Sequence, residues 1–216
     1  GSISHDTNHE NGDRVITIIP DPVSLGNGMW IGRWNLRLTN LSPVKEAGYH
    51  AWMNPGEAPR TAYFQNPTLS HTINSLACGH HTIAVASYNG RSGITSPFSG
   101  RGPTRDGRHK PDLRAHGESV MAASSGTRSG VFALSGTSMS APAVTGLVAR
   151  LMGHHHRQGL TTSAEGLHRA VVKTAQGGGG WNAEGGHGDA DSLAIVYQEE
   201  SVAKRVRAFP RRASFQ

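Results

Sequence analysis

The chain has 216 residues, of which 36% are hydrophobic and 17% charged, with a formal net charge of +6. This length suits one ordinary domain or one and a half smaller ones, and the composition excludes a disordered chain. No apolar run approaches the roughly 18 residues that cross a bilayer, and the single cysteine excludes an intrachain disulfide. The basic tail, residues 198–216, is expected to be solvated, so we predict no nucleic-acid and no membrane partner.

Residues 1–71 are predicted to form a β-rich module. The run RVITIIP (14–20) is β-branched and ends at a proline, and residues 29–40 alternate apolar with polar side chains. Both patterns are typical of strands, and the segments GNG, NPGEAP and QNP between the candidate strands indicate turns. We predict an antiparallel sheet here, with three tryptophans in its core rather than on a binding platform: Trp30, Trp34 and Trp52.

The pattern changes after Leu69. The run HTIAVASY (81–88) lacks polar alternation, as expected for a strand covered on both faces, and two further short apolar runs follow it. Residues 138–152 have helical apolar spacing, at Val144, Leu147, Val148 and Leu151. A second helix is predicted over 163–176 with Ser163 as N-cap, and a short last helix over 189–198.

The segment ALSGTSMSAPAVTG (133–146) places a serine at the mouth of the first predicted helix. Ser138 would lie among backbone N–H groups without partners, at the positive end of the helix dipole. Such a position can present a nucleophile and hold a developing oxyanion. Taken by itself, the pattern is more often that of an ordinary N-cap serine.

Several motifs in one order favour the nucleophile. SGTSMSAPAVTGLVA closely resembles the nucleophile segment of subtilisin-like serine proteases (subtilases), Gly-Thr-Ser-Met-Ala/Ser-x-Pro, and FSGRGPTRDGRHKPDLRAHG (98–117) resembles the segment that precedes it. The resemblance is collinear over about 72–197. It implies an α/β fold in which residues 72–197 are the C-terminal part of a subtilisin-like parallel-sheet catalytic domain. Residues 1–71 resemble the antiparallel β-sandwich insertion that some large bacterial subtilases carry.

The resemblance implies a serine endopeptidase with Ser138 as its nucleophile, acting on a protein or peptide without a cofactor. The family's triad aspartate lies in Asp-Ser/Thr-Gly, its histidine in His-Gly-Thr-His and its oxyanion asparagine in Ala-Gly-Asn, and none of these motifs occurs here. We therefore expect these groups upstream of residue 1, in a missing N-terminal half of the catalytic domain that would be this chain's partner. Calcium often stabilises the family, but the sequence holds no convincing metal site.

Two alternatives to this interpretation stay open. A local histidine could act as the base, with His109, His116 and His187 as candidates, although a base also needs an orienting partner behind it. His116 stands where the family has the proline of Ala-Pro-Gly. The chain could also be an inactive subtilase-like binding or scaffold module.

Three polar features have plainer explanations. The segment HDTNHENGD (5–13) could hold a metal but is predicted to be a polar turn, since no flanking element fixes ligand geometry. Asp112 follows a proline and is predicted to be a turn or cap residue. The histidines 154–156 are predicted to follow the helix in solvent.

Overall fold

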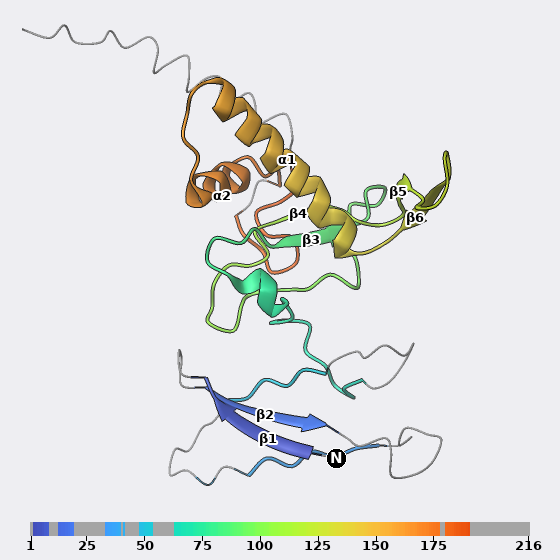
Figure 1. Ribbon diagram of the computed structural model, residues 1–216. Helices are drawn as coiled ribbons and strands as arrows, with labels where there is room; N and C mark the ends of the chain where they lie inside the picture. The colour runs from blue at the N-terminus through green and yellow to red at the C-terminus, as the bar shows by residue number, and fades with distance from the viewer. Residues whose placement is uncertain are drawn as a thin grey trace, which may run out of the picture. The chain divides into compact units, whose positions relative to one another are not determined.

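The computed structural model describes residues 2–8, 13–19, 33–39, 41, 48–53, 63–177 and 180–190. It divides the chain into two compact units, Gly1–Ala62 and Tyr63–Gln216. The first unit contains the strands β1 (Ser2–Thr7) and β2 (Arg14–Ile19). The second contains the four strands β3 to β6 and the helices α1 and α2, which hold the candidate site (Figure 1).

The first unit is built on an antiparallel pair, β1 and β2, in register from Ser2 opposite Ile19 to Thr7 opposite Arg14. The β-branched run at 14–20 therefore forms a strand, as predicted. The segment 5–13 was predicted as a turn, but its first residues belong to β1. Within the described ranges, no group of three or more histidine, cysteine or acidic side chains could hold a metal ion.

The strand prediction for residues 29–40 is wrong over 33–39, the part that the structure describes. Residues 33–39 belong to no strand, and Trp34 and Trp52 are each 63% exposed rather than in a sheet core. Alternating side chains form a half-buried strand only when a partner strand and a covering layer are present. No described residue of this unit supplies them, so the β-sandwich stays a prediction.

The second unit is organised around two short parallel strands. Strand β3 (Val85–Tyr88) pairs with β4 (Leu113–His116), in register from Val85 opposite Leu113 to Tyr88 opposite His116. Each outer edge is covered by a further segment, because the Ser96 N–H bonds the Ser87 carbonyl and the Arg114 N–H bonds the Gly188 carbonyl. The predicted run at 81–88 thus forms a strand with buried residues, which confirms the α/β character of this unit.

Helix α1 (Thr137–Arg157) packs across both strands (Figure 1). Its buried stripe includes Val144, Leu147 and Leu151, which form one core with Leu113 and Ala115 of β4. The predicted helical spacing is therefore confirmed. The helix continues to Arg157, so the histidines 154–156 lie within it and His154 is buried, contrary to the prediction that they follow it in solvent.

The shorter helix α2 (Ala164–Lys173) contacts α1 and adds Val171 to the core. Ser163 caps it as predicted, because its hydroxyl accepts the Gly166 N–H at 3.1 Å. The predicted last helix is wrong at Asp189, which instead bridges Gln176, and its residues from 191 on lie outside the described ranges, as does the basic tail. Neither described helix is long and apolar enough to span a bilayer.

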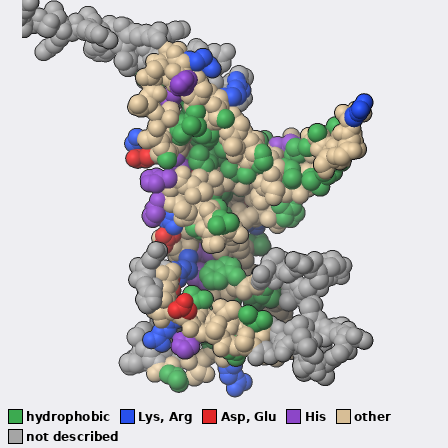
Figure 2. All heavy atoms as spheres, in the orientation of Figure 1, with side chains coloured by type: hydrophobic (Ala, Val, Ile, Leu, Met, Phe, Trp, Pro, Cys, Tyr) green, Lys and Arg blue, Asp and Glu red, His purple; other side chains and the backbone are tan. Residues whose placement is uncertain are grey.

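Strands β5 (Val120–Ala123) and β6 (Val131–Leu134) form an antiparallel hairpin between β4 and α1. Figure 1 shows it extending away from the two parallel strands, and Figure 2 shows hydrophobic side chains along it. Four of its large apolar residues are 45–62% exposed: Met121, Val131, Phe132 and Leu134. The hairpin thus leads into α1 with an uncovered apolar surface among the described residues.

A buried charged cluster ties the amino ends of the two parallel strands together. The Asp112 carboxylate accepts the Ala84 N–H at 2.6 Å, pairs with the Lys110 ammonium at 2.7 Å and lies 2.8 Å from His168 Nε2 of α2. Asp112 and Lys110 are only 3% and 4% exposed. Asp112 is therefore not the turn or cap residue predicted from the sequence, but the centre of a buried ion pair.

Asp112→Asn is expected to destabilise the protein by about 3–5 kcal/mol, because it leaves the buried Lys110 ammonium without its counter-charge. Urea unfolding of the intact protein measures the change. The matched control is Glu165→Gln, which removes an exposed pair with Arg169 on α2 and is expected to cost about 0.5 kcal/mol or less. Equal losses in the two variants would contradict the role given to Asp112.

Candidate active site

Ser138 is the second residue of α1, at the carboxyl ends of β3 and β4. Its side chain is exposed, and none of the described residues hydrogen-bonds its hydroxyl or its backbone N–H. The next N–H, of Met139, bonds back to the Gly136 carbonyl at 3.0 Å. The first turn therefore presents a hydroxyl and an unpaired N–H side by side in the positive field of the helix terminus.

Pro142 lies in the second turn of α1, not in the first turn where a missing N–H has no cost. In a regular helix the N–H at this position would bond the carbonyl four residues earlier, which belongs to Ser138. Proline has no N–H, so the Ser138 carbonyl lacks its usual helical partner. The backbone on both sides of Ser138 is thus less constrained by helix hydrogen bonds than in an ordinary helix.

Gly117 fixes where α1 begins. Its N–H bonds the Tyr88 carbonyl at the end of β3 at 3.1 Å, and its carbonyl accepts the Gly136 N–H at 2.8 Å. A Cβ at residue 117 would collide with the hydroxyls of Ser87 and Ser140 and lie 2.8 Å from the Gly136 carbonyl. Only glycine lets the end of β4 approach the start of α1 this closely.

Gly117→Ala is expected to destabilise the protein by about 1–3 kcal/mol, the range for overpacking a tight interior. It is also expected to slow any reaction of the Ser138 hydroxyl, because the added methyl displaces the Gly136 carbonyl two residues away. The matched control is Gly146→Ala in α1, where a Cβ meets nothing within 4 Å. This variant is expected to be neutral or more stable by up to about 1 kcal/mol. Thermal unfolding and active-site labelling of both variants check the prediction, which fails if the two behave alike.

The neighbouring serines have structural partners. Ser140 is fully buried and donates its hydroxyl to the Ala115 carbonyl of β4 at 3.0 Å, which holds the first turn of α1 against the sheet. The Ser135 hydroxyl accepts the Ser119 N–H at 2.9 Å. Of the serines in SGTSMS, Ser138 is therefore the one whose hydroxyl has no bond to a described residue.

The sequence model of the subtilase family matches residues 23–188. The chain belongs to the subtilase family. The match covers both the module at 1–71, from residue 23 on, and the segment that carries Ser138.

Relatives of this subtilase are much longer than the chain. It is 45% identical over 105 residues to the subtilisin-like protease SBT3.11 of Arabidopsis thaliana, covering 44% of this chain and 13% of that protein. It is 34% identical over 132 residues to the human membrane-bound transcription factor site-1 protease, covering 58% of this chain and 12% of the relative. The chain thus spans about an eighth of the length of these relatives.

Solved structures agree with the family. The Clostridium perfringens CspB protease superposes with a TM-score of 0.57 at 29% identity, over 62% of this chain and 30% of that one. The S218A mutant of the PatA protease domain superposes with a TM-score of 0.51 at 21% identity, over 62% of this chain and 47% of that one. At 21% identity, the similarity to PatA shows a shared fold only.

Each histidine considered as a local base of this subtilase has another contact. His109 stacks on Trp181 with ring centroids 4.3 Å apart, and His116 Nδ1 accepts the Gly90 N–H at 2.9 Å. The backbone N–H of His187 bonds the Asp112 carbonyl near the buried cluster. No hydrogen bond joins any of the three to Ser138 within the described ranges.

His116 fits locally where the family has a proline. Its imidazole lies close to Gly90, where a Cβ would stand 2.9 Å from Nδ1 and force the ring to shift. Its ring also meets the edge of Tyr88, whose pKa is raised mainly by burial and further by the Asp189 carboxylate, against the opposing charge of Arg114. The substitution is therefore accommodated at the carboxyl end of β4, beside Gly117.

Sequence reasoning missed the packing beneath the site. Ser87 and Ser96 share a buried hydrogen bond of 2.8 Å, and the Ser99 hydroxyl accepts the Ser87 N–H at 3.0 Å. Ser87 also lies against Gly117, because a Cβ at residue 117 would collide with its hydroxyl, and the bonds to Ser96 and Ser99 hold Ser87 in place. The one sequence signal of this close contact was Gly117, which ends the segment 98–117 that resembles the family.

Proposed function

We propose that this chain supplies the nucleophile and one oxyanion donor of a subtilisin-type serine endopeptidase. The observation that carries the proposal is the Ser138 hydroxyl, exposed and unpartnered among the described residues at the N-terminus of α1. The unpaired Ser138 N–H would donate to the oxyanion that forms when the hydroxyl attacks a peptide carbonyl. Family membership supports the reaction class.

The general base and its orienting acid would come from outside this chain. No described histidine hydrogen-bonds Ser138, and the family's aspartate and histidine motifs are missing from the sequence. A histidine from the N-terminal half of the catalytic domain would take the Ser138 proton and return it to the leaving amine, and an aspartate would hold its tautomer. An asparagine from that half would be the second oxyanion donor. The expected partners are therefore that half and a protein or peptide substrate.

Labelling with a fluorophosphonate probe tests the assignment. The intact protein is expected to be labelled at Ser138, because the probe reacts with a serine whose base and oxyanion hole are assembled. Ser138→Ala is expected to abolish labelling. Ser135→Ala and Ser140→Ala are the neighbouring controls, and the second is expected to slow labelling without abolishing it, since Ser140 only holds the turn. Loss of labelling in Ser140→Ala but not in Ser138→Ala would overturn the assignment.

An inactive scaffold is the second candidate function, favoured by the missing acid and base motifs. The two candidates differ in one outcome of the same experiment. If the intact protein contains the upstream aspartate and histidine motifs but no serine is labelled, the chain belongs to an inactive subtilase-like binding module. The sequence upstream of residue 1 should therefore be determined first, because it shows whether the aspartate and histidine motifs are present.

A further inference from the structure

His116, at the carboxyl end of β4, stands where the family motif Ala-Pro-Gly has its proline. The side chain is exposed, and its Nδ1 atom accepts the Gly90 N–H at 2.9 Å. An imidazole nitrogen accepts a hydrogen bond only when it carries no proton, so this bond requires the neutral ring with its proton on Nε2. His116 therefore holds the turn after β3, residues 89–92, only while the ring is neutral.

The same nitrogen lies next to a second backbone group. The Tyr88 carbonyl oxygen is 3.4 Å from His116 Nδ1, and this oxygen accepts the Gly117 N–H at 3.1 Å. The Gly117 carbonyl in turn accepts the Gly136 N–H, two residues before Ser138. The imidazole thus lies one hydrogen bond away from the contacts that fix where α1 begins.

The residue after Gly117 holds the same turn. The Glu118 carboxylate accepts a hydrogen bond from Asn89 Nδ2 at 2.7 Å. Gly117 is therefore flanked on both sides by side chains that bond residues 89–92. Of these two side-chain types, only histidine ordinarily changes its charge between pH 5 and pH 8.

No described acid pairs with the His116 imidazole. The Asp189 carboxylate pairs with Arg114, and the Glu118 carboxylate bonds Asn89. A proton on Nδ1 therefore gains no ion pair, and it turns the acceptor of the Gly90 N–H into a second donor. The charged and titratable groups of the segments around the ring are Tyr88, Arg91, Arg114, Glu118 and Asp189.

We propose that His116 is a positioning residue that couples the pH of the solution to the start of α1. The neutral ring holds Gly90 and leaves the Tyr88 carbonyl to the Gly117 N–H. A proton taken from solvent onto Nδ1 breaks the Gly90 bond and makes the ring a donor that competes for the Tyr88 carbonyl. The start of α1 is then less well held, so reaction at the Ser138 hydroxyl slows as the pH falls. Only this last step rests on the proposed function.

Hydrogen exchange of backbone amides, followed by mass spectrometry, tests the coupling in the intact protein carrying Ser138→Ala. Protection is compared at pH 5 and pH 8 after correction for the intrinsic exchange rates. Segments 85–92 and 134–141 are expected to lose about 3- to 10-fold in protection at pH 5, which corresponds to one hydrogen bond. This measurement does not depend on peptidase activity.

Two variants of His116 separate its protonation from its packing. His116→Asn keeps an acceptor near the position of Nδ1 that does not titrate, so protection is expected to be equal at the two pH values. His116→Leu has no acceptor, so protection of segment 85–92 is expected to be low at both. A residue that only fills space would not produce this difference.

Fluorophosphonate labelling of Ser138 provides the functional measurement. The expected triad histidine also titrates, so labelling slows at pH 5 in every variant. The parent is expected to slow about 3- to 10-fold more than His116→Asn between pH 8 and pH 5. Absence of labelling in all variants would contradict the proposed peptidase, while the exchange measurement still decides the role of His116.

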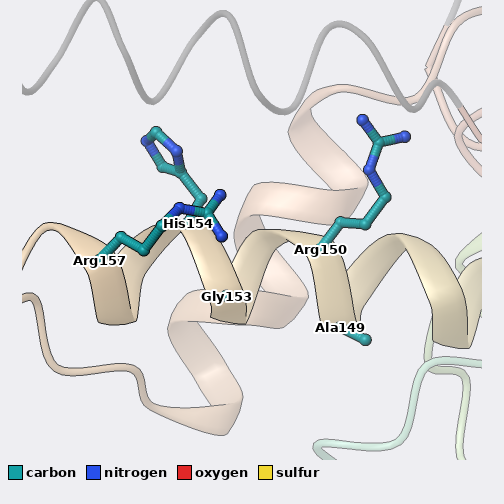
Figure 3. Close-up of a pocket in the computed structure, with 5 residues that line it drawn as sticks. All are labelled: Ala149, Arg150, Gly153, His154 and Arg157. Carbon is teal, nitrogen blue, oxygen red and sulfur yellow. The ribbon is translucent and has the colours of Figure 1, made fainter.

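The matched control is His156→Asn, an exposed histidine near the other end of α1, which is expected to keep the pH dependence of the parent. Its neighbour His154 does not serve, because it is buried in the part of α1 that carries Arg150 and Arg157 (Figure 3). Circular dichroism melting shows that each variant is folded. Equal protection of the parent at both pH values, or a loss at pH 5 that persists in His116→Asn, would overturn the proposal.

Discussion

Ser138→Ala is expected to lower kcat/KM of the intact protein on a peptide substrate by about 10⁴- to 10⁶-fold. The change removes only the hydroxyl and leaves the start of α1 as it is, since none of the described residues bonds that hydroxyl. The loss should therefore fall on the chemical step, with folding unchanged. Steady-state hydrolysis of a fluorogenic peptide library measures it, and thermal unfolding checks the fold.

The control for this substitution is Ser163→Ala, the same change at the N-cap of α2. It removes a structural bond to the Gly166 N–H and is expected to cost about 1 kcal/mol of stability without changing kcat/KM. The two serines thus separate a chemical from a structural role. If both variants hydrolyse peptides at the parent's rate, Ser138 is not the nucleophile.

The 216-residue chain by itself is expected to hydrolyse peptides about 10⁴- to 10⁶-fold more slowly than the intact protein. A serine without a base remains a weak nucleophile, and no described histidine reaches Ser138. The measurement compares the purified chain with the intact protein at equal concentration. Turnover by the chain alone at ordinary protease rates, abolished by Ser138→Ala, would show that the base lies within it.

The same chain is expected to self-associate. The β5–β6 hairpin exposes Phe132 and Leu134 by 45% each and Met121 by 61%, and such apolar surfaces usually mark an interface. Sedimentation at increasing concentration checks this expectation. A chain that stays monomeric and unfolds in one cooperative transition would contradict the half-domain interpretation.

Local sequence signals predicted much of the second unit. Three predictions that depend on residues close in the chain are confirmed. They are the apolar spacing of α1, the Ser163 N-cap of α2 and the continuous apolar run that contains β3. The failures have long-range causes. Residues 33–39 alternate apolar with polar side chains but have no described partner strand. Asp112 follows a proline and resembles a turn residue in the sequence, whereas in the fold Lys110 and His168 contact its carboxylate.

The candidate site was predictable in part for the same reason. The motif around Ser138 is contiguous, so the sequence places this serine at the start of a helix. What fixes that start comes from elsewhere: Gly117 meets Tyr88 and Gly136 across the fold, and Ser140 reaches the Ala115 carbonyl. Contacts between residues 19 or more positions apart leave little local pattern. The burial of His154 within α1 was missed because three consecutive histidines resemble a solvated tract.

The two ends of the β3–β4 pair hold different kinds of residue. The buried Lys110–Asp112 pair closes the amino ends of β3 and β4, while Ser138 stands at their carboxyl ends. Because the strands between them are only four residues long, the two regions are close in space yet share no side chain. An engineer could therefore seek thermostability by strengthening the bonds around Asp112, for example its contact with His168 of α2, and leave the surroundings of Ser138 unaltered.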